Sequence, residues 1–471
     1  MKTICFYFEI HQMMHLKRYR FFEIGNDHYY YDDYMNETEI NEVVDKSYIP
    51  TLKALLQMIE ETQGEFKFSL SISGVAFEQL EIHAPSVIDL IQKIHKTGCC
   101  EILSEPYSHG LSSLASTENF KREVKRQRDL MKQVFGKNPT VFRNSSLIYS
   151  DDIGAVVSEM GFKGMLTEGA KHILGWKSPH YLYHCSQAPN LKLLLRDYRL
   201  SDDIGLRFSN KDWSGYPLFA ETYIDWINQL PKESQIVNLF MRLSTFGVSQ
   251  PLSSNILEFL KALPRVAKDQ SITFSTPSEI IKRSKESIGI DVPYPMSWVD
   301  EERDTSAWLG NTLQREAFGK LYQLSERVHL SNDRRLKQDW DYLQASNNFR
   351  FMTTKNSLIP VNRGIYDSPY DAFTNYMNIL ADFIKRVESL YPADMDDEEL
   401  SAIAMVVQNQ GDEINVLQKE VDKWRKKAEK AEGAKKVKSV AKAKTTSVKK
   451  AAPAKKATPA KKGKSEDEKE K

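Results

Sequence analysis

Short apolar runs of strand length alternate with amphipathic helical stretches from the N-terminus to about Phe274. Residues 66–72 alternate apolar and polar side chains in the manner of a strand, whereas residues 118–135 have helical spacing and stop at Gly136. Parallel strands must be joined by a crossover, most often a helix, so this alternation predicts an α/β fold with a parallel sheet. From about Asp300 the apolar spacing becomes helical throughout.

Length and composition fit a large buried core. The chain has 471 residues, of which 41% are hydrophobic, and this length suits more than one domain. Mean hydropathy is −0.50 and no run approaches the roughly 18 apolar residues of a membrane span, so we expect no membrane partner. An acidic residue, Glu9, occurs within the first nine residues, which therefore indicate a strand and not a signal peptide. We therefore predict a cytoplasmic protein with reduced, buried thiols at its four cysteines: Cys5, Cys99, Cys100 and Cys185.

The near-neutral net charge of +1 hides a strong asymmetry. Residues 434–471 carry 14 lysines against 4 acids, a net charge of +10, which leaves −9 on residues 1–433. The last segment consists of lysine, alanine, proline and hydroxyl residues and predicts a disordered basic tail. Such a tail either binds nucleic acid non-specifically through phosphates or only solubilises the protein, and the sequence leaves both open.

A heptad pattern precedes the tail. Nine side chains, all apolar or small except Gln410, recur at alternating spacings of four and three residues: Ile403, Val407, Gln410, Ile414, Leu417, Val421, Trp424, Ala428 and Ala431. This spacing predicts a short coiled-coil helix over residues 396–433. The seam either forms a homo-oligomer through residues 403–431 or packs within the chain.

Five segments, in order along the chain, carry a family resemblance. They are Phe6–Gln12 (FYFEIHQ), Gly74–Gln79 (GVAFEQ), Ser104–His109 (SEPYSH), Phe142–Tyr149 (FRNSSLIY) and Met241–Gln250 (MRLSTFGVSQ). Together they resemble the α-amylase branch of family 57 glycoside hydrolases. The resemblance spans roughly residues 1 to 385 and implies a seven-stranded (β/α) barrel over residues 1–290, a helical domain packed on it over residues 291–395, and an α-glucan or maltooligosaccharide ligand.

The two catalytic positions of that family are changed here. By resemblance, the nucleophile position is Ser146, where the family has glutamate, and the acid/base position is Arg242, where it has aspartate. Residues 346–350 likewise replace Ser-Asp-His-Phe-Tyr with Ser-Asn-Asn-Phe-Arg. Retaining hydrolysis needs two carboxyl groups about 5–5.5 Å apart, and an arginine stays protonated at any physiological pH. The sequence therefore predicts a catalytically degenerate protein that binds α-glucan with little or no hydrolysis.

Two other functions stay open. Carboxylates near strand ends can be recruited in place of the missing pair, which would give a weakly active α-amylase or 4-α-glucanotransferase: Glu9, Glu78, Glu105 and Asp202. In the other function, the coiled coil and the tail have the main role of the protein, and the barrel is an interaction scaffold.

The predicted substrate-binding residues are polar groups at strand ends and two aromatic residues of the helical part: His11, Gln12, Glu78, Glu105, His109, Arg143, Asp202, Trp308 and Trp340. Aromatic residues at helical spacing equally fit a core. His11 and His15 have a His-x-x-x-His spacing, but it places both rings on one face only in a helix, and the preceding residues indicate a strand. We expect no metal and no cofactor.

Overall fold

The computed structural model describes residues 2–284, 286–357 and 361–391, together with residues 406, 410, 413, 414, 416–418, 420, 421 and 423–425. The chain divides into two compact units, Met1–Met395 and Asp396–Lys471. The predicted barrel and helical segments therefore belong to the same unit.

The first unit is built on a ten-stranded sheet whose pairings are parallel, with one exception. Its strands are β1 (Thr3–Ile10), β2 (Phe68–Ile72), β3 (Cys100–Ile102), β4 (Val141–Arg143), β5 (Gly164–Glu168), β6 (Leu182–Cys185), β7 (Lys192–Arg196), β8 (Ile236–Arg242), β9 (Thr273–Phe274) and β10 (Ile288–Ile290). β1 lies between β2 and β8, in register Phe8 with Leu70 and Phe8 with Met241. Only β6 runs antiparallel to its neighbour β7. The predicted α/β class with a mostly parallel sheet is confirmed.

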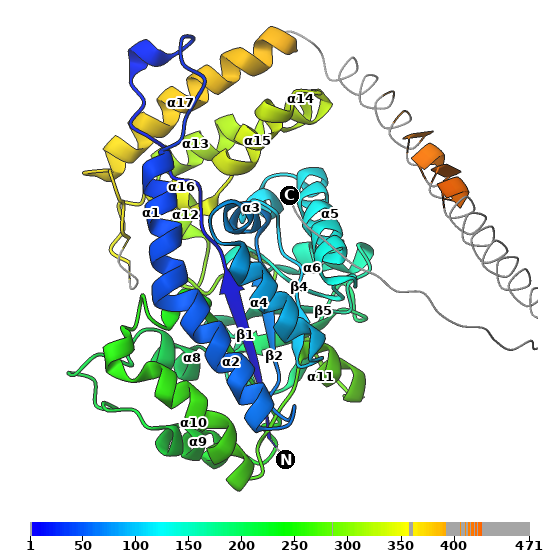
Figure 1. Ribbon diagram of the computed structural model, residues 1–471, viewed down its shortest axis with the longest axis vertical. Coiled ribbons are helices and arrows are strands. Elements are labelled where there is room, and N and C mark those ends of the chain that lie inside the picture. The colour runs from blue at the N-terminus through cyan, green and yellow to red at the C-terminus, as the bar shows by residue number, and fades with distance from the viewer. Residues whose placement is uncertain are drawn as a thin grey trace, which may run out of the picture. The chain divides into compact units, whose positions relative to one another are not determined.

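Helices connect the strands, and the described elements that follow β10 are all helices. They are α1 (Asp33–Val43), α2 (Ile49–Glu61), α3 (Gly74–His83), α4 (Pro85–Lys96), α5 (Thr117–Phe135), α6 (Asp151–Glu159), α7 (Lys171–Leu174), α8 (Tyr198–Gly205), α9 (Ala220–Gln229), α10 (Ile256–Asp269), α11 (Pro277–Arg283), α12 (Ser306–Leu309), α13 (Thr312–Tyr322), α14 (Ser325–Leu330), α15 (Arg334–Leu343), α16 (Ser346–Arg350) and α17 (Pro369–Leu390). In Figure 1, α13, α14, α15 and α17 gather at one end of this unit.

The core follows from the pattern of β1, whose eight residues are all buried. Successive side chains of a strand point to opposite faces. Cys5 and Tyr7 accordingly join one hydrophobic cluster, and Ile4, Phe6 and Phe8 join another. The first cluster also contains buried side chains of α12 to α17, so the helical part shares a core with the strands. All four cysteines are buried, and no disulfide joins them.

The described residues of the second unit are helical. Five positions of the predicted seam are exposed within this single chain: Gln410, Ile414, Leu417, Val421 and Trp424. The seam positions Ile403, Val407, Ala428 and Ala431 and the whole predicted tail lie outside the described residues, so the coiled coil and the tail stay predictions. Within the described chain, no helix combines the length and apolar character needed to span a membrane.

Candidate active site at the carboxyl ends of the strands

Parallel strands bring their carboxyl ends to one edge of the sheet, and the predicted site residues meet there. Glu9 is the penultimate residue of β1, Arg143 ends β4 and Arg242 ends β8. Glu105 and His109 follow β3 in the connection to α5. The structure therefore brings together three of the predicted binding residues, Glu9 and the predicted acid/base position.

One arginine and one histidine bridge the two acidic side chains of this group, Glu9 and Glu105. Nη2 of Arg143 lies 3.0 Å from Oε1 of Glu9 and also contacts Glu105. Nε2 of His109 lies 3.3 Å from Glu9, and its Nδ1 lies 3.3 Å from Glu105. All four side chains are buried. We call Glu9, Glu105, His109 and Arg143 the Arg143 cluster.

The two carboxylates differ in protonation. Burial raises the pKa of Glu9, but the positive charge of Arg143, with His109 and Arg242, outweighs burial and holds that pKa at about 2. Burial raises the pKa of Glu105 to about 8, with the negative charge of Glu9 adding to it and Arg143 opposing. At neutral pH the Arg143 cluster thus contains one carboxylate and one carboxylic acid.

His11 completes the arrangement by stacking on His109, with ring centroids 4.0 Å apart. Its Nδ1 hydrogen-bonds to the Ser73 hydroxyl at 2.8 Å, and its Nε2 is buried without a hydrogen-bond partner. Burial lowers the pKa of both imidazoles, that of His109 to about 3. Both rings are therefore neutral at pH 7 and can exchange hydrogen bonds with hydroxyl groups.

Ser146 lies in a 3-10 turn, Ser145–Leu147, directly after β4. Its φ of 50° is in the left-handed region, and its carbonyl accepts a hydrogen bond from the Trp298 backbone at 3.2 Å. In the described part of the chain, no histidine or carboxylate hydrogen-bonds to the Ser146 hydroxyl. A serine without an adjacent base is a weak nucleophile.

Arg242 directs its side chain back over the same edge. Its Nε lies 3.6 Å from Oε2 of Glu9, and its guanidinium lies 5.8 Å from the centroid of the Trp298 ring. The side chain is 45% exposed. A permanent cation therefore lies at the end of β8, where the motif resemblance predicts the acid/base.

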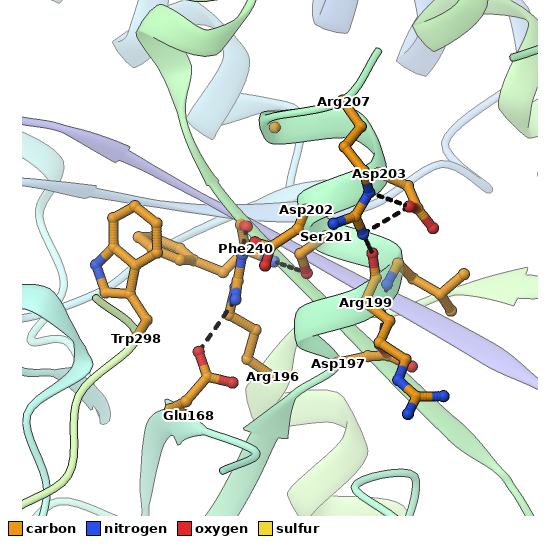
Figure 2. A network of polar contacts seen from close by, with 12 residues as sticks. Glu168, Arg196, Asp197, Arg199, Ser201, Asp202, Asp203, Arg207, Phe240 and Trp298 are labelled. Carbon is orange, nitrogen blue, oxygen red and sulfur yellow. Dashed lines mark hydrogen bonds and ion pairs between the residues drawn. The ribbon is translucent and has the colours of Figure 1, made fainter. Parts of the chain in front are cut away.

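Figure 2 shows a second network of buried charges. The Phe240 ring links it to the first, since its centroid lies 5.8 Å from the Arg143 guanidinium and 6.0 Å from that of Arg196. Nη1 of Arg196, the last residue of β7, lies 3.0 Å from Glu168 at the end of β5, and its Nη2 binds Asp202 of α8. Nη2 of Arg303 lies 3.2 Å from the other oxygen of Asp202. Figure 2 shows the rings of Phe240 and Trp298 against Arg196; the Trp298 centroid is 5.4 Å from its guanidinium. We call Glu168, Arg196, Asp202 and Arg303 the Arg196 network.

A cavity of about 970 Å³ opens next to the Arg196 network. Asp202 and Arg303 line it on one side, and Tyr198, Arg207 and Trp213 line it elsewhere. The guanidinium of Arg303 lies 5.1 Å from the Tyr198 ring, and that of Arg207 lies 5.8 Å from the Trp213 ring. Aromatic rings next to paired charges can bind a sugar ring and its hydroxyls.

The remaining predicted residues lie elsewhere. Gln12 is buried, and its carbonyl accepts a hydrogen bond from Gln79 at 2.9 Å. Glu78 accepts hydrogen bonds from the hydroxyls of Tyr107 and Tyr342, outside the Arg143 cluster.

Trp308 and Trp340 require a correction, because each is 1% exposed and belongs to the main hydrophobic cluster. Neither presents an open ring face to a sugar. Sequence reasoning missed Arg196, Glu168 and Arg303, and Arg303 lies in an irregular connection between β10 and α12 that has no apolar period.

Three donors in the Arg143 cluster have the spacing of metal ligands. One atom each of Glu9, Glu105 and His109 lies within 4.8 Å of the others. Arg143, however, already places a positive charge against both carboxylates, 3.0 Å from Glu9. A metal ion at this point would meet that charge, so these residues do not suit one.

Comparison with known proteins gives the family. The model described as Glycosyl hydrolase family 57 matches residues 5–293. A Methanocaldococcus jannaschii protein named "Putative alpha-amylase" is 38% identical over 405 residues, which cover 82% of this chain and 85% of that protein. The chain belongs to glycosyl hydrolase family 57.

Solved structures of family 57 share the fold. The branching enzyme of Pyrococcus horikoshii matches with a TM-score of 0.60 at 13% identity, covering 85% of this chain and 94% of the enzyme. The α-amylase AmyC of Thermotoga maritima matches with a TM-score of 0.55 at 13% identity, covering 85% of this chain and 96% of that enzyme. This family 57 chain therefore keeps the architecture while it carries Ser146 and Arg242 at the two positions given by the motif resemblance.

Proposed function

We propose that this family 57 protein binds α-glucan and hydrolyses it little or not at all. The observation that carries the proposal is the pairing of Arg242 with Glu9 at 3.6 Å. Arg242, at the predicted acid/base position, is a cation that neutralises the buried carboxylate of Glu9. Such a cation can neither donate a proton to a leaving oxygen nor take one from water. The polar frame around it, with His11, His109 and Arg143, can still bind hydroxyl groups.

We propose further that the parallel pairings close into a seven-stranded barrel. They lead from β1 through β2 to β3 and from β4 through β5 and β7 to β8, which pairs with β1. An isolated parallel bridge between Ser104 and Phe142 supports the remaining connection, from β3 to β4. Such a barrel places substrate at the carboxyl ends of its strands, which is the edge that carries the cavity beside Asp202.

The weakly active alternative has one observation in its favour. Glu9 and Glu105 have pKa values of about 2 and about 8, as a nucleophile and a general acid would. Against it stands Arg143, which contacts both carboxylates and occupies the space that a glycosidic oxygen would need. Self-association through residues 403–431, nucleic-acid binding through residues 434–471 and a cytoplasmic location remain predictions.

Isothermal titration with maltooligosaccharides tests the binding part. We expect saturable binding to the wild type, and about tenfold weaker binding to Trp213→Ala, because covering roughly 60 Å² of apolar ring surface contributes about 1.5 kcal/mol. Tyr34→Ala is the matched control, since Tyr34 is an exposed ring on α1 that does not line the cavity. Circular dichroism confirms that each variant is folded. The absence of any heat of binding to the folded wild type would refute the proposal.

A further inference from the structure

A second cavity, of about 820 Å³, lies between α5 and α15 and shares no lining residue with the cavity beside Asp202. Five of its lining residues are cationic: Arg122, Arg126, Arg334, Arg335 and Lys337. Three lining residues are acids: Glu78, Glu123 and Asp341. The walls therefore carry more positive than negative side chains.

The three acids already have partners within the protein. Glu78 accepts hydrogen bonds from two tyrosine hydroxyls, as described above. Glu123 accepts a hydrogen bond from the backbone N–H of Ser108 at 2.8 Å. Asp341 forms an ion pair with Arg126. Each of these carboxylates therefore already has a partner within the protein, and Glu78 also lies 3.5 Å from Arg126.

The cations divide into paired and unpaired ones. Arg122 pairs with Glu326 at 3.0 Å. Arg334, Arg335 and Lys337 have no carboxylate within ion-pair distance in the part of the chain that the structure describes. Burial, with the nearby Arg122 and Arg126, lowers the pKa of Lys337 against the opposing effect of Asp341. The cavity thus holds positive charge that the protein itself does not balance.

Two further groups indicate a ligand. Trp340 lines the cavity, and its indole N–H is buried without a hydrogen-bond partner. A buried donor without an acceptor costs about 1–3 kcal/mol, so such donors in native proteins call for an explanation. Tyr29 also lines the cavity, with the Arg335 guanidinium 5.8 Å from its ring. The ring is 38% exposed and offers an apolar surface beside the cations.

We propose that this cavity binds the phosphate group of a phosphorylated saccharide. Guanidinium groups match phosphate oxygens in a fork, and a phosphate ester carries about −1.5 to −2 charges at pH 7. Arg334, Arg335 and Lys337 supply the balancing charge, Trp340 donates to an oxygen, and the Tyr29 ring packs against the sugar. The saccharide part rests on the proposed glucan-binding function, whereas the phosphate part is independent of it.

Isothermal titration of the full chain with inorganic phosphate, glucose 6-phosphate and glucose tests the proposal. We expect phosphate to bind, glucose 6-phosphate to bind more tightly, and both affinities to fall with added salt. In Arg334→Ala/Arg335→Ala both should weaken about tenfold, because charge-assisted contacts are lost. Both arginines are exposed, so the variant should fold. The matched control is Arg265→Ala/Lys268→Ala, which removes two exposed cations outside this cavity.

Equal phosphate affinity in the double variant and the control would overturn the site. Equal affinity of the wild type for phosphate and glucose 6-phosphate would overturn the assignment of a saccharide ligand. Maltooligosaccharide binding should be the same in wild type and double variant. A protein that binds phosphate but not maltooligosaccharide would therefore contradict the proposed function and leave the phosphate site standing.

Discussion

The two buried charge groups at the carboxyl edge of the sheet differ in how completely their polar atoms are satisfied. In the Arg196 network, none of the side-chain atoms of Glu168, Arg196, Asp202 and Arg303 is buried without a hydrogen-bond partner. In the Arg143 cluster, both carboxylate oxygens of Glu9, one of Glu105 and Nη1 of Arg143 are buried without one, although Glu9 keeps its ion contacts.

This difference indicates that the Arg196 network supports the fold, whereas the Arg143 cluster is the candidate site. Buried charges stabilise a fold only when hydrogen bonds satisfy their remaining atoms, which is the condition that the Arg196 network meets. Buried polar groups that lack hydrogen-bond partners are uncommon in native structures and occur most often at functional positions. The Arg143 cluster keeps the polarity of a site, and our proposal assigns that site to binding instead of proton transfer.

The largest expected effect is on stability. Arg196→Met should lower the free energy of unfolding by about 3–5 kcal/mol, because it leaves the buried carboxylates Glu168 and Asp202 without compensation. Arg143→Met should cost less, since Glu105, with its pKa of about 8, is already protonated at pH 7. Denaturant unfolding of both variants measures the difference. An equal or larger loss for Arg143→Met would show that the comparison between the two groups is wrong.

The next effect is a pH dependence that belongs to the Arg143 cluster. The pKa of Glu105 rises from 4.5 to about 8 on folding, so the folded state binds more protons between these values. Stability from this group is therefore full below about pH 4.5 and is lost as pH rises toward 8. Glu105→Gln, which cannot ionise, should gain on the order of 2 kcal/mol relative to wild type between pH 5 and pH 8.

The contribution of Glu9 to stability depends on pH in the opposite direction, so the titrations of Glu9 and Glu105 can be distinguished. Its folded pKa of about 2 lies below the ordinary 4.5, so its contribution is present above pH 4.5 and is lost as pH falls toward 2. Denaturant unfolding at pH 3, 5 and 8 therefore distinguishes the two residues. A difference between Glu105→Gln and wild type that stays constant from pH 5 to pH 8 would contradict the assigned protonation.

The smallest effect is expected at Arg242. Arg242→Met should change the free energy of unfolding by less than about 1 kcal/mol, since the Arg242 side chain is 45% exposed and Glu9 keeps Arg143 as a closer partner at 3.0 Å. Arg265→Met is the control, because Arg265 lies 3.7 Å from Glu221 in another exposed pair. A loss well above the control would place Arg242 inside the buried scaffold and not at the mouth of a site.

Much of this architecture could be predicted from the chain. The apolar runs that become β1, β5 and β8 identify strands by their continuity, and β2 does so by its alternation. β6 and β10 could not be predicted: β6 is interrupted by His184, and Ile288 of β10 is 41% exposed. Neither segment has the period of a buried strand.

The site was predictable only where a motif carries it. Ser146 and Arg242 follow from their segments, and His11, Glu105 and His109 meet as strand-end residues should. The Arg196 network joins strand ends to a loop residue from a distant segment, and no local pattern pairs Arg303 with Asp202. Trp308 and Trp340 show the reverse case, because helical spacing of aromatic residues does not say which face meets the core.

Turnover of amylose distinguishes a binding protein from an enzyme. We predict that purified protein releases no reducing sugar above the buffer background while it binds maltooligosaccharides. Ser146→Glu with Arg242→Asp should restore little, because residues 346–350 also depart from the motif that the resemblance gives. Robust turnover by the wild type that disappears in Glu105→Gln would contradict the account and assign the chemistry to Glu9 and Glu105.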